Sequence, residues 1–357
     1  MTNNDKYLVK YSNLFLVKGF LHSVILDLGR NDYEFITNPT YSFLMNANKK
    51  RVIDARRKNK NLLNLAIAKD WIFLCEKYEI NLFPEISIKY LTNVLIQNSN
   101  IIFEGNLRKL KHILELLCSA KVSCKYITII IEFSISAIDF TQLCTLLGKF
   151  TIIKFEIFIK YNNQLLKVFK NINLRPSIIS ITVFESLEKP SFYKFIFVEQ
   201  TLEFNFIDYN YFNPTLELFI ESLYFNTYTN KKLLINESGN VFKSFKDREN
   251  LDIFNIEKIE NIILKLSKIN NWEVPKSKID VCNVCEFRNM CIDSCDIMSR
   301  KDGTFYRAKE CNYNPFISKW DNETNFYYLK DCGIICNTSG IKINKKKLEN
   351  TLEKIYV

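Results

Sequence analysis

Residues 126–160, YITIIIEFSISAIDFTQLCTLLGKFTIIKFEIFIK, decide the fold class of the central part of the chain. The apolar runs at 126–133 and 151–160 are rich in isoleucine and phenylalanine and have the length of buried strands. Between them, residues 139–150 have the length and apolar content of a helix. A strand, a helix and a second strand in this order indicate a βα unit with parallel strands.

The same alternation continues on both sides of this stretch. We expect helices at 107–118 and 163–171 and a further strand at 177–184. Such units build a mostly parallel sheet, and there are too few of them here for a closed eight-stranded barrel. The sequence therefore predicts an α/β fold.

The first hundred residues have the pattern of a small α+β unit. We expect strands at 23–28 and 33–38, joined by a turn at 29–32, and a helix at 62–78. The mixture of short elements distinguishes this region from the βα units that follow.

The pattern changes again after residue 201. We expect a strand at 202–206, a helix at 213–225, a hairpin that turns at 237–240 and a helix at 254–270. A cysteine-rich segment follows this last helix.

The composition is that of a globular protein. The chain has 357 residues, 47% of them hydrophobic and 25% charged, which suits a sizeable core and two domains. The most apolar stretch, 126–138, is interrupted by Glu132 and is too short to span a bilayer, and the N-terminus lacks a secretory signal pattern. We therefore expect a soluble, cytoplasmic protein, in which clustered cysteines bind metal more often than they form disulfides.

The formal net charge of +10 is concentrated in two segments, 49–60 and 342–350. One interpretation is a solvated surface; the other is a docking face for an acidic peptide or a nucleic acid. Motifs of nucleic-acid-binding folds are absent from the sequence, so the peptide is the favoured partner of the two.

Five cysteines lie close together near the C-terminus. Cys282 and Cys285 form a C-x2-C pair, whose tight turn can bring two thiolates to one metal. Cys291 is near enough to join them, and Cys311 can complete a set of four after a loop. Four thiolates fit either tetrahedral zinc or a [4Fe–4S] cluster, and the spacing leaves both open.

The full spacing, C-x2-C-x5-C-x3-C followed by a gap and a further cysteine, resembles the tail of the SPASM domain. That domain follows the radical S-adenosylmethionine barrel in many peptide-modifying enzymes. Four stretches are similar to the peptide maturases of grasp-with-SPASM systems, which are encoded beside an ATP-grasp ligase: 13–36, 230–241, 272–291 and 311–320. The resemblance is weak between about residues 60 and 200.

The resemblance implies one [4Fe–4S] cluster held by Cys282, Cys285, Cys291 and Cys311. Cys295 would belong to a second auxiliary cluster, but Tyr228 and Ser244 stand where its upstream thiols are expected. We therefore expect that site to be lost and Cys295 to be a spare thiol. As an alternative, Cys295 could share a replacement site with Cys332 and Cys336, which otherwise are ordinary cysteines.

The C-x3-C-x2-C signature that radical S-adenosylmethionine enzymes carry after their first barrel strand is absent from the sequence. The cysteines upstream of the cluster are expected to be buried hydrophobic residues: Cys75, Cys118, Cys124 and Cys144. Whether the protein is an enzyme is therefore left open.

The resemblance implies four regions: an N-terminal α+β region at 1–100, a degenerate, barrel-like βα region at 101–212, a SPASM domain at 213–325 and a C-terminal extension at 326–357. It implies an iron–sulfur maturation partner that binds or presents a ribosomally made peptide to an ATP-grasp ligase. A precursor rich in acidic residues would match the basic charge. The alternatives are a peptide-modifying redox enzyme and a zinc-stabilised interaction protein.

Other candidate residues give weaker signals. His22 and His112 are the only histidines, and we expect neither to be catalytic. Arg288 could donate hydrogen bonds near the cluster or to a substrate carboxylate, or lie at the surface. The scattered carboxylates are expected on a solvated face: Asp27, Glu221 and Glu286.

Overall fold

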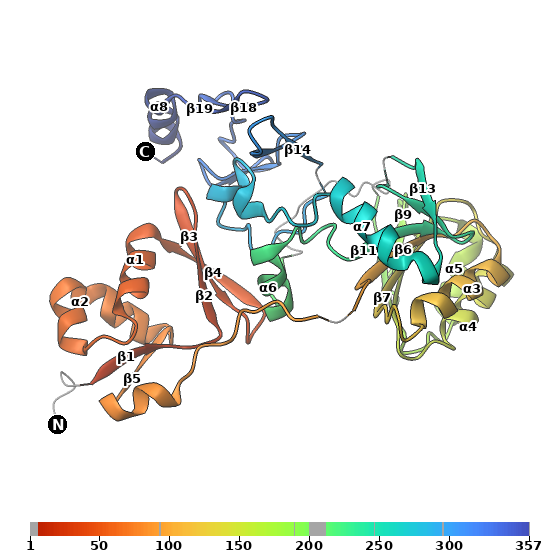
Figure 1. Cartoon of the computed structure of the whole chain (residues 1–357), viewed down its shortest axis with the longest axis horizontal. Coiled ribbons are helices and arrows are strands. Elements are labelled where there is room, and N and C mark those ends of the chain that lie inside the picture. The colour runs from red at the N-terminus through yellow and green to blue at the C-terminus, as the bar shows by residue number, and fades with distance from the viewer. Residues whose placement is uncertain are drawn as a thin grey trace. The chain divides into compact units, whose positions relative to one another are not determined.

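The computed structural model describes residues 6–92, 94–188, 190–199, 212–245, 247–294 and 296–356. The chain forms two compact units, coloured along the chain in Figure 1. The first unit consists of Met1–Tyr90, Phe206–Thr227 and Glu273–Val357, and the second of Leu91–Asn205 and Tyr228–Trp272.

The second unit contains an eight-stranded sheet in the order β10-β9-β8-β7-β6-β11-β12-β13. The strands from β10 to β11 in this order are parallel, and the last two are antiparallel to their neighbours. Their bounds are β6 Asn98–Ile102, β7 Tyr126–Ile131, β8 Lys154–Lys160, β9 Ile178–Phe184, β10 Phe195–Phe197, β11 Lys232–Asn236, β12 Asn240–Phe242 and β13 Asn250–Ile253.

Four helices pack in the core of this unit: α3 (Leu107–Cys118), α4 (Ala137–Leu147), α5 (Asn163–Asn171) and α7 (Ile259–Ile269), the last preceded by η4 (Ile256–Lys258). Because β6, β7, β8 and β9 follow one another in a single direction, right-handed crossovers place α3, α4 and α5 on one face of the sheet. Each of these three helices begins at a polar side chain that accepts a backbone N–H: Asn106, Ser136 and Asn162.

The core of the second unit follows from strand register. Ile101, Ile129, Ile157 and Ile181 are paired across β6, β7, β8 and β9, and all four are fully buried. The α/β class and the mostly parallel sheet expected from the sequence are therefore confirmed. The predicted strand and helix ranges between 107 and 184 match to within about three residues at each end.

The first unit contains the antiparallel sheet β2-β3-β4 and the separate pair β1-β5. Helices α1 and α2 connect these two sheets, and α2 is interrupted at Asn59. The bounds are β1 Tyr7–Lys10, β2 Leu14–Lys18, β3 His22–Asp27, β4 Asp32–Thr37, α1 Asn38–Ala47, α2 Val52–Ala68, β5 Ile72–Cys75, η2 Lys77–Leu82 and α6 Leu216–Tyr224.

The helix expected at 62–78 is wrong in its second half. Helix α2 ends at Ala68, and Ile72–Cys75 is the strand β5, which pairs with β1. Asp70 adopts a left-handed backbone conformation, with φ +53°, which ends the helical run. Pairing with a distant strand overrides the local apolar pattern.

The cysteine-rich part of the first unit consists of short elements. They are η5 Lys276–Lys278, η6 Cys282–Val284, β14 Ile297–Ser299, β15 Phe305–Arg307, β16 Tyr313–Asn314, β17 Lys319–Trp320, β18 Ile334–Asn337, β19 Gly340–Ile343 and α8 Lys345–Tyr356. Consecutive strands pair as antiparallel hairpins, in which each strand has four residues or fewer.

One hydrophobic cluster joins the cysteine-rich part to the N-terminal sheet. Val24 and Leu26 of β3 pack with Phe219 of α6 and with Phe287 and Cys291 of the cysteine-rich loop. The Phe287 ring lies 5.7 Å from that of Trp320 and 4.9 Å from that of Tyr313. Packing therefore unites segments that the sequence assigns to separate regions.

The remaining expectations concern residues after 200. The strand expected at 202–206 lies outside the described residues. The helix at 213–225 is confirmed as α6, and the hairpin is confirmed, with its turn between Asn236 and Asn240. The helix at 254–270 corresponds to η4 and α7. No helix in the described part of the chain is long and apolar enough to cross a membrane.

Candidate metal centre

The C-x2-C pair forms the tight turn that its spacing predicts. The N–H of Cys285 donates to the carbonyl of Cys282 at 3.0 Å, within the 3₁₀ turn η6. Val281, just before it, has φ +70°. A β-branched residue rarely adopts this left-handed conformation, so the backbone entering the pair is strained.

The structure brings the four proposed ligands into one neighbourhood. Burial raises the pKa of Cys285 well above its ordinary value, and charges on Glu286, Cys291 and Cys282 add to this. Burial also raises the pKa of Cys291, to about 11, and there Cys311 and Cys282 are close enough to contribute. The Cys311 thiol is likewise near Cys282. Five of the six possible thiol pairs therefore influence one another electrostatically.

One buried cation, Lys276, and one partly buried cation, Arg307, lie near these thiols. Lys276 and Arg307 both oppose the rise in the pKa of Cys291 and Cys311, because positive charge favours the thiolate form. Asp293 pairs with both cations, and Lys276 and Asp293 are each 5% exposed. A buried positive environment of this kind suits a site whose net charge is negative.

Helix α6 holds the loop that carries Cys291. The Thr227 hydroxyl donates to the Cys291 carbonyl at 2.8 Å, and the Asn289 amide donates to the Ser222 hydroxyl at 2.8 Å. Both hydrogen bonds are buried. The loop is therefore fixed from the helix side as well as by its own turn.

Glu286 is fully buried, so its expected place on a solvated face is wrong. Its Oε1 accepts hydrogen bonds from the Tyr313 hydroxyl at 2.5 Å and the Ser318 hydroxyl at 3.1 Å. Burial raises the pKa of Glu286, although these two donors partly oppose the rise. The side chain ties the segment after Cys311 to the loop that carries Cys285.

The other two carboxylates expected on a solvated face, Glu221 and Asp27, have different environments in the fold. Glu221 is 6% exposed, so the solvated-face expectation is wrong for it too. Asp27 organises the β3–β4 turn: its Oδ1 accepts from the Asn13 amide and from the N–H groups of Gly29 and Arg30.

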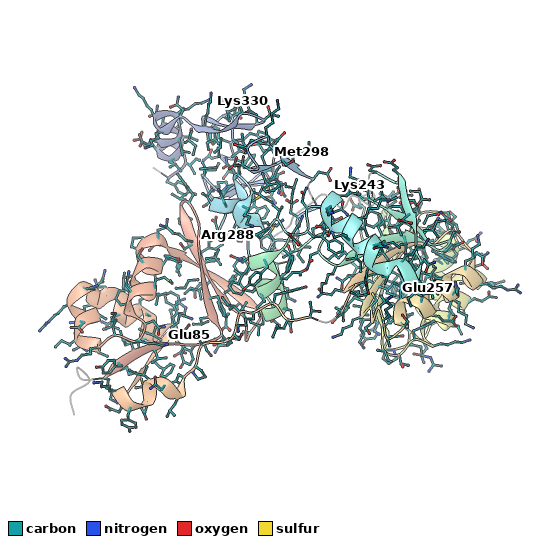
Figure 2. The ribbon with its side chains drawn as sticks, viewed as in Figure 1. Glu85, Lys243, Glu257, Arg288, Met298 and Lys330 are labelled. Atoms are coloured by element: carbon teal, nitrogen blue, oxygen red, sulfur yellow. The ribbon has the colours of Figure 1, made fainter. Side chains whose placement is uncertain are left out.

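Arg288 fastens the turn between β2 and β3 to the cysteine-rich loop (Figure 2). Its Nη1 donates to the carbonyls of Lys18 at 2.6 Å and Cys285 at 2.8 Å. The N–H of Phe20 donates to the Val284 carbonyl at 2.8 Å. Of the roles considered from the sequence, Arg288 fills that of a hydrogen-bond donor next to the proposed centre.

Gly19 is required by this close approach. A Cβ at this position would lie 2.2 Å from the His22 carbonyl oxygen and 2.8 Å from Glu286 Oε2. We expect Gly19→Ala to lower the free energy of unfolding of the first unit by about 2 kcal/mol, because a packed site resists added volume. Chemical denaturation measures this.

The matched control for that change is Gly303→Ala. Nothing lies within 4 Å of a Cβ at Gly303, and only its φ of +80° opposes substitution. We expect a cost of about 1 kcal/mol there. Equal losses at the two glycines would contradict the packing argument.

The other described cysteines near the C-terminus are Cys332 and Cys336. Burial raises the pKa of Cys336, and Asp280 and Cys282 are close enough to add to this rise. Cys332 is fully buried in the core formed with α8, and its sulfur accepts from the Asn314 amide at 3.4 Å. Cys336 on β18 receives a hydrogen bond from Arg300 at 3.6 Å. Cys295 lies outside the described residues, so its role stays a prediction.

The two residues in place of the missing thiols make ordinary contacts. The Tyr228 ring lies 5.8 Å from the Lys232 ammonium. The Ser244 hydroxyl accepts from the N–H of Asp247 at 3.1 Å.

Three of the four upstream cysteines are buried as expected: Cys75, Cys124 and Cys144. Cys118 is exposed, so the expectation is wrong there, because it is the last residue of α3 and lies off the apolar face. His112 is also exposed on α3. Burial lowers the pKa of His22, and the neighbouring Ser23 hydroxyl donates to Asn38 rather than to a histidine.

A row of polar residues crosses the second unit and was not noticed in the sequence. Asn100, Thr128, Glu156 and Ser180 are paired in register across β6, β7, β8 and β9. They alternate with the buried isoleucines and so point to the sheet face opposite α3, α4 and α5. Burial raises the pKa of Glu156. In the sequence, this row is indicated by a polar residue at alternate positions of otherwise apolar strands.

The donor set of the cysteine cluster suits a thiophilic metal. Within the described ranges, no three His, Cys, Asp or Glu side chains have the geometry of a formed metal site. The four thiols nevertheless share one buried, cation-lined region, and cysteine sulfur is the preferred ligand of zinc and of iron–sulfur clusters. The residues therefore fit either group.

The fold and this site define the structural class of the protein. It is an α/β protein with a parallel-rich eight-stranded sheet in one unit and a cysteine-rich part in the other. No family model and no curated protein matches the chain. Among solved structures, SuiB of Streptococcus suis covers 79% of this chain and 94% of its own, at 11% identity and a TM-score of 0.29. SuiB bound to S-adenosylmethionine covers 80% of this chain and 94% of its own, at 10% identity and a TM-score of 0.25. Likenesses this weak carry no conclusion about this chain.

Proposed function

We propose that the chain is an iron–sulfur, SPASM-type maturation partner for a ribosomally made peptide, which it binds or presents to an ATP-grasp ligase. The proposal includes a degenerate barrel-like origin for the βα region. The observation that carries it is the gathering of four thiols with the C-x2-C-x5-C spacing and a distant fourth member in one buried region.

The four cysteines would hold one [4Fe–4S] cluster: Cys282, Cys285, Cys291 and Cys311. Such a cluster would crosslink the loop and could exchange electrons. The chain's own residues exclude water and set the positions of the ligands. Phe287 and Tyr313 pack in the same hydrophobic cluster as Cys291, and Lys276 and Arg307 supply positive charge.

The surrounding hydrogen bonds support a structural role for the proposed centre. Glu286 joins the Cys285 loop to the Tyr313 segment, and Arg288 joins it to the β2–β3 turn. The metal would therefore stabilise the contact between the N-terminal sheet and the cysteine-rich part. A structural centre agrees with a protein that binds a peptide and leaves bond formation to a partner ligase.

Metal analysis after anaerobic purification tests the cofactor. We expect about four iron and four sulfide ions per chain, the content of one [4Fe–4S] cluster. A colourless protein with neither iron nor zinc would overturn the proposal.

A zinc-stabilised interaction protein is the second candidate, because the C-x2-C turn suits a structural zinc ion as well as an iron–sulfur cluster. Closed sets of four cysteines commonly hold structural zinc. One zinc ion per chain without iron or sulfide would replace the iron–sulfur assignment and leave the peptide-binding role intact.

The partner role predicts that an ATP-grasp ligase and a short precursor peptide are encoded beside the gene, and it is tested with these two proteins. The ligase is expected to form side-chain ester or amide links, and we expect this chain to raise the rate of that reaction. Mass spectrometry of the precursor, with and without the chain, follows the loss of water at each link. An unchanged rate together with no binding of the precursor would remove the partner role.

A further inference from the structure

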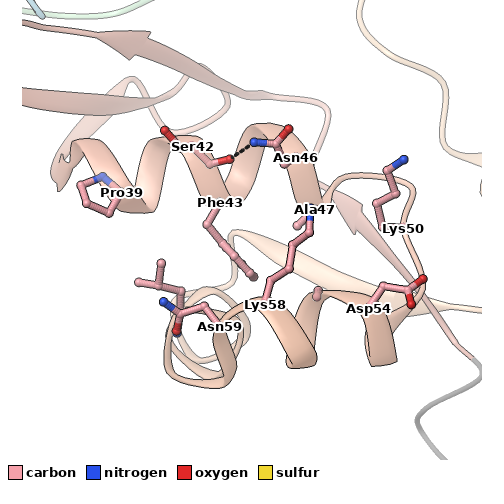
Figure 3. Close-up of a pocket in the computed structure, with 11 residues that line it drawn as sticks. Pro39, Ser42, Phe43, Asn46, Ala47, Lys50, Asp54, Lys58 and Asn59 are labelled. Carbon is pink, nitrogen blue, oxygen red and sulfur yellow. Dashed lines mark hydrogen bonds between the residues drawn. The ribbon is translucent and has the colours of Figure 1, made fainter.

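A pocket of about 490 Å³ lies between α1 and α2 of the first unit (Figure 3). Its base is apolar: Phe43 and Ala47 of α1 and Ala55 of α2 belong to the hydrophobic core of this part of the chain. Figure 3 shows Phe43 reaching from α1 toward the facing helix. The pocket therefore offers an apolar base, under a polar rim, to a side chain from outside.

A break in α2 shapes one end of this pocket. Asn59 has extended backbone angles, φ −160° and ψ 95°, in the middle of the helix. Its side chain then accepts the N–H of Leu62 at 3.0 Å, which starts the second half of the helix as an N-cap does. Asn59, where the helix is interrupted, and the preceding Lys58 both line the pocket.

The surface around the pocket is strongly basic. The sequence range 38–69 contains eight lysine and arginine residues but a single carboxylate, that of Asp54. Lys50 and Lys58 line the pocket itself, are exposed, and form no ion pair among the described residues. Lys49 and Lys69, by contrast, are paired with Glu85 and Glu34.

We infer that this pocket binds an acidic peptide segment, with an apolar side chain in the cavity and flanking carboxylates on Lys50 and Lys58. The inference rests on the proposed function, which supplies a peptide partner but no place for it. The charge of the rim gives the preference for acidic residues, and the apolar base gives the preference for one large non-polar side chain.

The same observations disfavour a nucleic acid. Phosphate contacts require cations, but a nucleic acid has no aliphatic side chain to fill a cavity of this size. Bases stack on exposed aromatic faces, whereas Phe43 is 8% exposed and packed in the core. The apolar base therefore favours the peptide.

The test uses the full-length, metal-loaded protein and a fluorescein-labelled peptide in which leucines alternate with pairs of aspartate and glutamate. Fluorescence anisotropy gives its affinity at low and high salt. The paired variants are Lys50→Glu with Lys58→Glu, and as a matched control Lys167→Glu with Lys170→Glu on α5 of the second unit. Both changes alter the net charge equally, and all four lysines are exposed.

We expect the pocket variant to weaken binding about tenfold and the control variant less than threefold. A peptide with serine in place of leucine should bind about tenfold more weakly than the original. Thermal unfolding and metal content of both variants should match the wild type.

Four outcomes overturn the inference. Equal losses in the two variants would mean that long-range charge alone attracts the peptide. Equal binding of the serine peptide would mean that the cavity is not used, and tighter binding of a single-stranded RNA of equal charge would assign the surface to nucleic acid. In the first two cases the wild type still binds an acidic peptide and the proposed function stands; a wild type that binds no peptide would overturn both.

Discussion

Cys291→Ser is expected to reduce the bound metal to less than about a tenth of the wild-type content. A serine hydroxyl is a poor ligand for zinc or for an iron–sulfur cluster, and Cys291 lies at the centre of the thiol group, influenced by both Cys282 and Cys311. Structural zinc sites contribute about 10–16 kcal/mol of apparent binding free energy, so loss of one ligand also unfolds the surrounding loop. Metal analysis and limited proteolysis measure the two effects.

Two other cysteines provide controls for this substitution. Cys144 is buried in α4 of the second unit, and Cys118 is exposed at the end of α3. Serine at either position should leave the metal content unchanged, although at Cys144 the buried hydroxyl should lower stability by about 1–3 kcal/mol. Full metal retention by Cys291→Ser, or equal loss in the controls, would exclude Cys291 from the ligand set.

Glu237→Ala is expected to destabilise the second unit by about 3 kcal/mol or more. The Glu237 carboxylate is 4% exposed and accepts the backbone N–H groups of Glu104 at 2.9 Å, Gly105 at 3.1 Å and Asn106 at 2.9 Å. These donors lie in the loop just before α3 (Leu107–Cys118), where the positive end of the helix dipole favours negative charge. Alanine would leave all three without this acceptor.

Glu237→Ala should loosen the loop before α3 under conditions in which the rest of the second unit is still folded. Hydrogen exchange at the amides of Glu104, Gly105 and Asn106 should accelerate, because these groups lose protection directly. Glu237→Gln should rescue only part of the loss, since its NH₂ group would face N–H donors. Denaturant unfolding measures the total.

The control for this prediction is Glu257→Ala. Glu257 is an exposed carboxylate on η4 of the same unit, and its removal should change stability by less than about 0.5 kcal/mol. If both variants unfold at the same denaturant concentration, the carboxylate does not hold the β6–α3 loop.

The sequence predicted the second unit well because its signals are local. Apolar runs, helix periodicity and the capping residues Asn106, Ser136 and Asn162 all act within a few residues of the elements they specify. The same locality misplaced residues 72–75, where the strand depends on pairing with β1. Pairing between segments about 65 residues apart leaves no local trace.

The candidate site divides in the same way. The C-x2-C-x5-C spacing and the resemblance to the SPASM domain together selected the proposed ligands, because spacing alone also left Cys295 as a candidate. The proposed set is Cys282, Cys285, Cys291 and Cys311. The residues that surround them were predicted only in part. Glu286 was expected on a solvated face but is buried, whereas hydrogen bonding near the cluster was one of the roles considered for Arg288. The requirement for glycine at position 19 follows only from the close approach of the β2–β3 turn to Glu286.

By itself, the sequence determined the α/β class and the βα alternation, because short-range periodicity encodes both. The four proposed ligands stay a prediction from spacing and from the SPASM resemblance. The tertiary structure decided that the N-terminal sheet and the cysteine-rich part share one core. It also placed Glu237 on the start of α3, and it opened a pocket between α1 and α2. These features depend on which distant surfaces exclude water together, a property of the folded chain rather than of any one segment.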